Sequence, residues 1–270
     1  MTDRDRPKHS GPEHPSEGTS GFTALVTGSS SGIGAAVCRR LATSRGRDIG
    51  IAVHARHNRA GAEQVAEEIR GSGSRAEVLQ GDIAEAGVAE RLIDETVQKF
   101  GRLDALVANA GFPILKSLNE GTRKDLDYAF RGNLFSFYEL LRAVQPHLTK
   151  AREPRVVAVG SFTAHVFRTD MRSFPMSATA KGGLETMVRS LAAELAPSGI
   201  TVNCVVPGFI EKDPGTGDGL SQQELSAMAE RIPLGRIGRS TEVAAAIEFL
   251  LSPGAGYITG QALHVNGGLI

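Results

Sequence analysis

The chain has 270 residues, of which 41% are hydrophobic and 22% charged, a size and composition that suit a globular protein of one or two domains. Thirty Lys and Arg residues balance thirty Asp and Glu residues, so no net charge draws the protein to nucleic acid or to an anionic membrane. Two cysteines are too few for a disulfide framework or a zinc cluster, and no segment approaches the ~20 apolar residues of a membrane span, so we expect a cytoplasmic enzyme or binding protein without a metal.

Taken in chain order, the sequence predicts one folded domain behind a tail. Residues 1–20 are rich in Pro, Gly, Ser, His and charge, which predicts disorder. Apolar runs then predict strands at 22–27, 48–53, 76–80, 103–108, 155–160, 200–206 and 262–265. Segments of helical period predict helices at 33–44, 60–71, 86–99, 122–149, 178–196, 221–230 and 240–251. Apolar strands that alternate with amphipathic helices indicate a parallel sheet covered on both faces, so we expect a doubly wound Rossmann domain of about seven strands over residues 21–270.

A glycine-rich turn joins the first predicted strand to the first predicted helix. Glycines keep such a turn tight and let its backbone approach a pyrophosphate, whose charge is stabilised by the amide groups at the helix N-terminus. A glycine cluster alone is weak evidence, but its position between a strand and a helix is the context that this motif needs. The residues predicted to bind a dinucleotide here are Gly28, Ser30, Ser31, Gly32, Ile33 and Gly34.

The turn resembles that of the short-chain dehydrogenase/reductase family, in the branch that includes the 3-oxoacyl-carrier-protein reductases. Similar motifs recur in Asn109-Ala110-Gly111 after the fourth strand, in the Pro207-Gly208 exit from the sixth, and in the C-terminal segment 233–268. The resemblance extends over 21–270. It implies a nicotinamide cofactor, a small-molecule substrate with a carbonyl or hydroxyl group, and a homotetramer or homodimer packed through the long helices and the last strand.

The resemblance also implies which residues contact the cofactor. Asn109, Ala110, Gly111, Pro207 and Gly208 match the family's motifs. The threonine that usually follows the Pro-Gly pair is absent, which leaves Ile210 for a backbone contact. Asp82 and Ile83 resemble the pair that contacts adenine, although an aspartate after a strand can equally cap the next helix.

The end of the second strand bears on the choice of dinucleotide. A carboxylate at this point would hydrogen-bond the ribose hydroxyls of NAD and repel a 2′-phosphate. The chain has no acid there and offers Arg56, whose guanidinium can pair with the phosphate. We therefore expect NADP(H) to be favoured, with NAD(H) possible and a solvated surface arginine as the alternative interpretation.

Four polar catalytic residues are implied by the resemblance, and three of them have a match. Asn133 would hold a water and brace the lysine, and Ser161 would hydrogen-bond the substrate carbonyl. Lys181 would bind the nicotinamide ribose and lower the pKa of its neighbour through its charge. One helical turn before Lys181, on the same face, the family's tyrosine is replaced by Ser177.

Three hypotheses remain open because of the missing phenol. In the first, the protein is an oxidoreductase with an atypical active site, and its proton comes from a water, from Ser177 or from His165. Losing a general acid costs about 10²- to 10⁴-fold in rate, while a positioned cofactor supplies a separate share of the acceleration. In the second, the protein binds its cofactor without turnover. In the third, a dehydratase or isomerase uses the same cleft without redox chemistry.

Substrate selectivity is expected to lie in three irregular segments, 112–120, 162–176 and 211–220. The last contains several Gly and Pro residues and is either a substrate lid or simply a long connection. Arg168 and Arg172 are candidates for binding an anionic group of the substrate.

Overall fold

The computed structural model describes residues 21–46, 48–170, 173–211 and 222–270. The predicted tail at 1–20, Arg172 and the part of the predicted lid after Glu211 lie outside the described residues. Within them, seven parallel strands form one sheet in the order β3-β2-β1-β4-β5-β6-β7. The strands are β1 (Phe22–Val26), β2 (Ile49–Ala55), β3 (Arg75–Gln80), β4 (Ala105–Ala108), β5 (Arg155–Val159), β6 (Thr201–Pro207) and β7 (Ala262–Val265). The predicted doubly wound Rossmann fold is confirmed.

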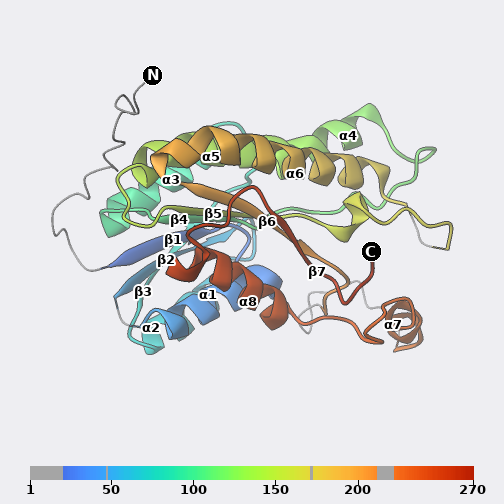
Figure 1. Ribbon diagram of the computed structural model, residues 1–270, viewed down its shortest axis with the longest axis horizontal. Coiled ribbons are helices and arrows are strands. Elements are labelled where there is room, and N and C mark those ends of the chain that lie inside the picture. Colours follow the sequence, from blue (N-terminus) through green and yellow to red (C-terminus); the bar gives the residue numbers. More distant parts are fainter. Residues whose placement is uncertain (1–20, 47, 171–172, 212–221) are drawn as a thin grey trace, which may run out of the picture.

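Helices cover both faces of this sheet (Figure 1). One face carries α1 (Gly32–Ser44), α2 (Arg59–Gly71) and α8 (Ser240–Leu251), and the other carries α3 (Val88–Phe100), α4 (Arg123–Phe130), α5 (Ser136–Leu148) and α6 (Pro175–Leu195). The short helix α7 (Gln222–Ala229) lies beyond the carboxyl end of the sheet, and single turns lie at Phe162–Ala164, Ala196–Ser198 and Pro253–Ala255. Apart from the predicted helix at 122–149, each predicted element is present, with boundaries shifted by a few residues.

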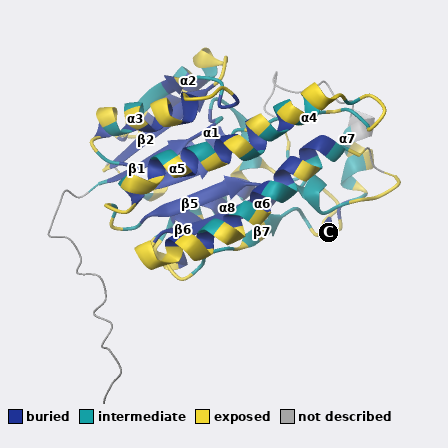
Figure 2. Ribbon diagram, turned by 90° about the horizontal axis from the view of Figure 1, so that it is seen from above, coloured by how far each residue is buried: buried dark blue, intermediate teal, exposed yellow. Residues whose placement is uncertain are grey.

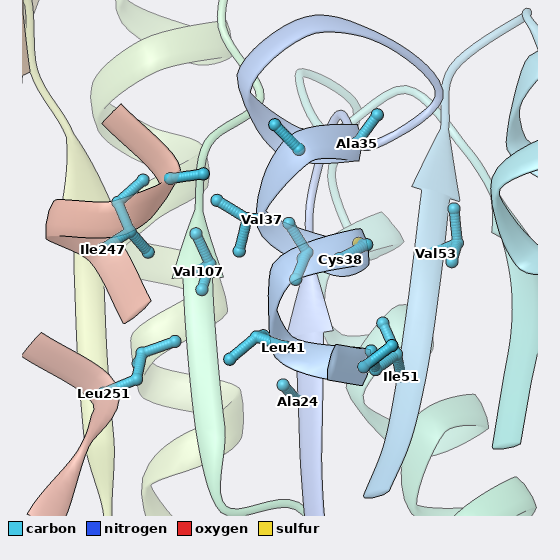
Figure 3. Close-up of a cluster of buried hydrophobic side chains, with 14 of the residues drawn as sticks. Ala24, Ala35, Val37, Cys38, Leu41, Ile51, Val53, Val107, Ile247 and Leu251 are labelled. Carbon is cyan, nitrogen blue, oxygen red and sulfur yellow. The ribbon is translucent and has the colours of Figure 1, made fainter. Parts of the chain in front are cut away.

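Two aliphatic cores lie on the two faces of the sheet, and Figure 2 shows the central strands as buried. Figure 3 shows the first core, where Val37 and Leu41 of α1 pack close to Ile247 and Leu251 of α8. The second core is formed by the other sheet face with α3, α5 and α6. Because the strands are covered on both faces, they carry continuous apolar runs rather than alternating ones.

The predicted helix at 122–149 is interrupted in the structure. It begins with a capping box at Thr122, whose Oγ1 accepts a hydrogen bond from the Asp125 amide at 3.2 Å while the Thr122 amide donates to the Asp125 carboxylate at 2.9 Å. After α4 the backbone forms a π-helical segment, Arg131–Phe135, before α5 begins. Such segments widen a helix locally and often occur at functional sites, and this one contains Asn133.

A buried ion pair fastens the entry of β4 to β1. The Asp104 carboxylate, only 2% exposed, accepts hydrogen bonds from Arg102 Nε at 2.8 Å and Arg102 Nη2 at 2.7 Å. It also accepts one from the Thr23 backbone amide at 2.8 Å. The Asp104 carboxylate therefore binds both the Arg102 guanidinium and the backbone of β1.

Replacing Asp104 by alanine should lower the free energy of unfolding by about 3 kcal/mol, because it removes the acceptor of the buried Thr23 amide and the carboxylate that the Arg102 guanidinium binds through two N–H groups. The matched control is Asp127→Ala, which removes the acid of an exposed pair with Arg131 at 3.2 Å and should cost less than about 0.5 kcal/mol. Urea denaturation of both variants measures the difference. Equal losses of unfolding free energy in the two variants would show that the Asp104 hydrogen bonds do not stabilise the fold.

Candidate active site

The predicted site residues gather at the carboxyl end of the sheet, around the point where the strand order reverses between β1 and β4. Ligands of open parallel sheets bind at this point. The turn after β1 supplies Gly28, Ser30, Ser31, Gly32, Ile33 and Gly34; β2 and β3 lead to Arg56, Asp82 and Ile83; and β4 leads to Asn109, Ala110 and Gly111. Ser161 follows β5, Pro207, Gly208 and Ile210 end or follow β6, Asn133 lies in the π-helical segment, and Ser177 and Lys181 lie on α6.

The turn after β1 has a shape that only glycine permits at two points. Gly28 has a φ of +63°, which L-residues with a side chain rarely adopt. At Gly34, an added β-carbon would lie 2.5 Å from the Gly28 carbonyl oxygen and 2.7 Å from Asn109 Nδ2. The turn therefore packs so tightly against Asn109 that no side chain fits at position 34.

The segment after β4 braces this turn. Asn109 Nδ2 donates hydrogen bonds to the carbonyl oxygens of Thr27 at 2.9 Å and Gly28 at 3.0 Å. In return, Thr27 Oγ1 accepts from the backbone amides of Asn109 at 3.1 Å and Ala110 at 3.0 Å. The side chain of Asn109 is thus used to hold the two strand ends together, so any contact that this segment makes with a cofactor falls to its remaining groups.

The residues of the turn fit a pyrophosphate. Ser31 occupies the N-cap of α1, but its side chain makes no capping hydrogen bond, and the first turn of the helix contains no acidic residue. A β-carbon placed on Gly32 would meet no atom within 4 Å, so space remains in front of the backbone. A helix N-terminus that is not capped by the Ser31 side chain, with space in front of it and no competing carboxylate, is what a phosphate requires.

His54 is a structural part of this turn that sequence reasoning missed. The imidazole is 1% exposed, its Nδ1 accepts a hydrogen bond from the Gly28 amide at 3.0 Å, and its Nε2 lies 3.0 Å from the Gly81 carbonyl oxygen. Because Nδ1 must be an acceptor, the ring is neutral. Burial lowers the pKa of His54, which keeps it so. A histidine inside an apolar strand was the only signal in the sequence.

Arg56 and Asp82, predicted at separate points of the chain, meet at the ends of β2 and β3. Arg56 Nη1 lies 3.6 Å from Asp82 Oδ2 and donates a hydrogen bond to Tyr128 Oη at 2.7 Å. Asp82 Oδ1 accepts from the Ala84 amide at 2.9 Å, a local turn that does not cap the next helix, because the N-cap of α3 is Gly87. Arg56 is therefore held by Tyr128 and Asp82 rather than extended freely into solvent.

Lys181 is buried beneath the site. Its Nζ donates a hydrogen bond to the Val159 carbonyl oxygen at 2.7 Å, and a β-carbon added at Gly111 would lie 3.1 Å from Nζ and 2.6 Å from Asn133 Oδ1. Desolvation lowers the pKa of Lys181 to about 8, although Cys204 and Glu185 partly oppose this. Asn133 Nδ2 donates to the Ala129 carbonyl oxygen at 2.8 Å, while its buried Oδ1 has no partner among the described residues.

The two serines of the predicted site have different partners. Ser161 Oγ lies 2.9 Å from Thr163 Oγ1. Ser177, 5% exposed, accepts a hydrogen bond on Oγ from the Ile114 amide at 2.7 Å. Because a hydroxyl that accepts one hydrogen bond still carries its own proton, Ser177 can donate to another group.

A histidine is paired with a buried glutamate beyond Lys181. His165 Nε2 lies 2.9 Å from both carboxylate oxygens of Glu185, which is 3% exposed and one turn beyond Lys181 on α6. His264 of β7 packs edge-on against His165, with ring centroids 4.6 Å apart. Arg168, predicted to meet an anionic substrate group, is paired with Asp170 through hydrogen bonds of 2.9 and 3.0 Å, which balances its charge.

Comparison with known proteins assigns a family to this arrangement. A family described as enoyl-(acyl carrier protein) reductase matches residues 28–270. A 3-oxoacyl-[acyl-carrier-protein] reductase of Staphylococcus aureus is 35% identical over 247 residues, which cover 92% of this chain and 97% of that protein. The chain belongs to the short-chain dehydrogenase/reductase family. The family expected from the sequence motifs is confirmed.

Solved members of the short-chain dehydrogenase/reductase family share the fold closely. A short-chain dehydrogenase of Burkholderia cenocepacia, in complex with NADP, is 32% identical, has a TM-score of 0.83, and is matched over 92% of this chain and 97% of its own. Acetoin dehydrogenase of Salmonella typhimurium is 28% identical with a TM-score of 0.82, covering 93% of this chain and 97% of its own. In the part of the chain that the structure describes, no helix combines the length and apolar character needed to cross a bilayer.

The neutral state of His54 predicts a loss of stability in acid. Because the folded pKa lies below the ordinary value of 6.5, the unfolded state takes up the proton first as the pH falls, and stability decreases by at most about 1.4 kcal/mol per pH unit below 6.5. His54→Asn keeps an acceptor for the Gly28 amide but cannot titrate, so urea denaturation should show a smaller acid loss. The exposed neighbour His57 provides the control variant His57→Asn, which should behave as the wild type; an unchanged acid loss in His54→Asn would contradict the assignment.

Proposed function

We propose that the protein is a nicotinamide-dependent oxidoreductase that interconverts a carbonyl and a hydroxyl group on a small molecule, with NADP(H) favoured. The observation that carries the proposal is the environment of Lys181, a buried amine whose pKa is near 8 and whose Nζ lies beside Gly111, at the end of β4. Burying an amine this deeply is costly, and perturbed pKa values of this kind cluster at functional sites. The named relatives are reductases and dehydrogenases, which supports the same chemistry.

Each residue of the proposed site has a defined task. When bound, the nicotinamide supplies or accepts the hydride. The amides at the start of α1 would hold the pyrophosphate, and Lys181 would donate a hydrogen bond to the nicotinamide ribose. The Ser161 hydroxyl would donate to the substrate carbonyl and so stabilise the negative charge that develops on its oxygen. Asn133 Oδ1, buried and without a partner among the described residues, would accept a hydrogen bond from a water that also contacts Lys181.

The proton that completes a reduction needs a source other than a phenol, because Ser177 stands where the family's motif carries a tyrosine. Ser177 is held with its oxygen toward the Ile114 amide and keeps a proton to donate. His165 is oriented by the Glu185 carboxylate, an arrangement in which an acid fixes the ring of a proton-transferring histidine. A water is the third candidate. The 3-oxoacyl reductase relatives make β-ketoacyl thioesters the first substrates to test.

The test is the consumption of NADPH at 340 nm with ketones, β-ketoacyl thioesters and quinones. We expect turnover by the wild type, and a loss of about 10²- to 10⁴-fold in Ser161→Ala, whereas Ser72→Ala, which removes a hydroxyl beyond α2, should leave the rate unchanged. A similar loss in either Ser177→Ala or His165→Gln identifies the proton donor, and no loss in either indicates water. A wild type that binds NADPH but is inactive on every substrate, with activity appearing only in Ser177→Tyr, would contradict the proposal and favour a cofactor-binding protein without turnover.

Lys181 also predicts a pH dependence of stability. Between about pH 8, its folded pKa, and 10.5, its ordinary value, the unfolded state binds more protons, so stability rises with pH across this window by up to about 3 kcal/mol. Lys181→Met should remove this rise and should be at least as stable as the wild type at pH 7. The difference between wild type and variant in urea denaturation isolates the effect from other groups, with the exposed Lys99→Met as control. A rise of equal size in Lys181→Met would contradict the burial of a perturbed amine.

A further inference from the structure

Only one nitrogen of the Arg56 guanidinium, Nη1, has a partner among the described residues. Its Nη1 donates to Tyr128 Oη at 2.7 Å and faces Asp82 Oδ2 at 3.6 Å. Its Nη2 and Nε make no hydrogen bond to any described residue, and the side chain is 42% exposed. Arginine binds phosphate in a bidentate manner through two N–H groups on one edge of the planar fork. The contact with Tyr128 therefore occupies one corner and leaves the Nε and Nη2 edge open.

Tyr128 is itself fixed in place by its neighbours. Its ring stacks on Phe112, with centroids 4.4 Å apart and planes inclined at 28°, and the Arg56 guanidinium lies 5.7 Å from the Phe112 ring. Phe112 in turn packs against Gly132 of the π-helical segment, where an added β-carbon would lie 2.3 Å from the ring. The phenol oxygen is thus presented by a rigid aromatic pair.

The contact joins the two sides of the crevice. Arg56 follows β2, whereas Tyr128 belongs to α4 on the opposite helix layer and Phe112 follows β4. The strands β2 and β4 flank β1, so the link from Arg56 to these aromatic residues spans the strand end that carries the glycine turn. A dinucleotide bound at that turn passes the same place.

We infer that Tyr128 is a positioning residue that selects the phosphorylated dinucleotide: its hydroxyl orients Arg56 so that the open edge of the guanidinium receives a 2′-phosphate. This inference rests on the proposed use of NADP(H). Without the phenol oxygen, the flexible side chain of Arg56 samples other rotamers and pairs more closely with Asp82. Both effects oppose phosphate binding. A phenylalanine at position 128 would keep the stacking on Phe112 and remove only the anchor.

Calorimetric titration with 2′,5′-ADP and with 5′-AMP tests the inference without requiring turnover. In Tyr128→Phe we expect the affinity for 2′,5′-ADP to fall about fivefold to tenfold, since one hydrogen bond to a charged group is lost, while the affinity for 5′-AMP stays the same. Arg56→Ala should reduce 2′,5′-ADP to the affinity of 5′-AMP, and adding Tyr128→Phe to it should cause no further loss. Tyr257→Phe, at a fully exposed tyrosine, is the matched control.

The outcomes distinguish a failure of the role given to Tyr128 from a failure of the NADP(H) preference. If Arg56→Ala weakens 2′,5′-ADP but Tyr128→Phe leaves it unchanged or tightens it, the role of Tyr128 is wrong and the NADP(H) preference stands. If Arg56→Ala has no effect on 2′,5′-ADP, or if the wild type does not prefer it to 5′-AMP, both the preference and the inference are wrong. With an active enzyme, the expected signature of Tyr128→Phe is a raised KM for NADPH with kcat unchanged within twofold and no change with NADH.

Discussion

The site depends on the hydrogen bonds that join the ends of β1 and β4. A parallel sheet that reverses its strand order leaves a crevice between these two strands, and nothing in the strands themselves sets its width. Thr27 and Asn109 set it by exchanging side-chain and backbone hydrogen bonds across the gap. The same bonds present the Gly28 carbonyl to α1, where only a glycine at position 34 fits. The shape of the turn that we propose binds a phosphate is therefore a consequence of the hydrogen bonds between the ends of β1 and β4.

Buried polar groups around the crevice follow one rule: each is neutral, or is paired by more than one partner. His54 stays neutral and accepts from the turn, and Glu185 is paired with both His165 and Arg189. Lys181 departs from the rule, because its one hydrogen bond to a described residue, the Val159 carbonyl, does not compensate for the burial of its amine. Proteins keep such unfavourable groups where chemistry needs them, which is why Lys181 is more informative than the better satisfied residues around it.

The sequence predicted the sheet, the order of elements and the position of the crevice, because apolar runs, helical period and the glycine turn are local signals. It could not predict contacts made by residues that are distant in the chain. Arg56 and Tyr128 are 72 residues apart, and nothing local to either indicates a partner. The π-helical segment was also missed, since residues 122–149 read as one continuous helix. His54 was visible, but only the fold shows that its ring faces Gly28.

The π-helical segment explains how the two ends of the proposed site come to be mechanically joined. The wider turn at Arg131–Phe135 brings Gly132 against the Phe112 ring and turns Asn133 toward the Phe112 carbonyl oxygen, 3.3 Å from its Nδ2. Phe112 also stacks on Tyr128, which holds Arg56. Packed aromatic rings and glycine contacts are stiff, so the Phe112 ring is held between Gly132 and Tyr128. Asn133 and Lys181 both reach Gly111, so Phe112 and the π-helical segment lie between the residues that we propose bind the 2′-phosphate and those that we propose act on the substrate.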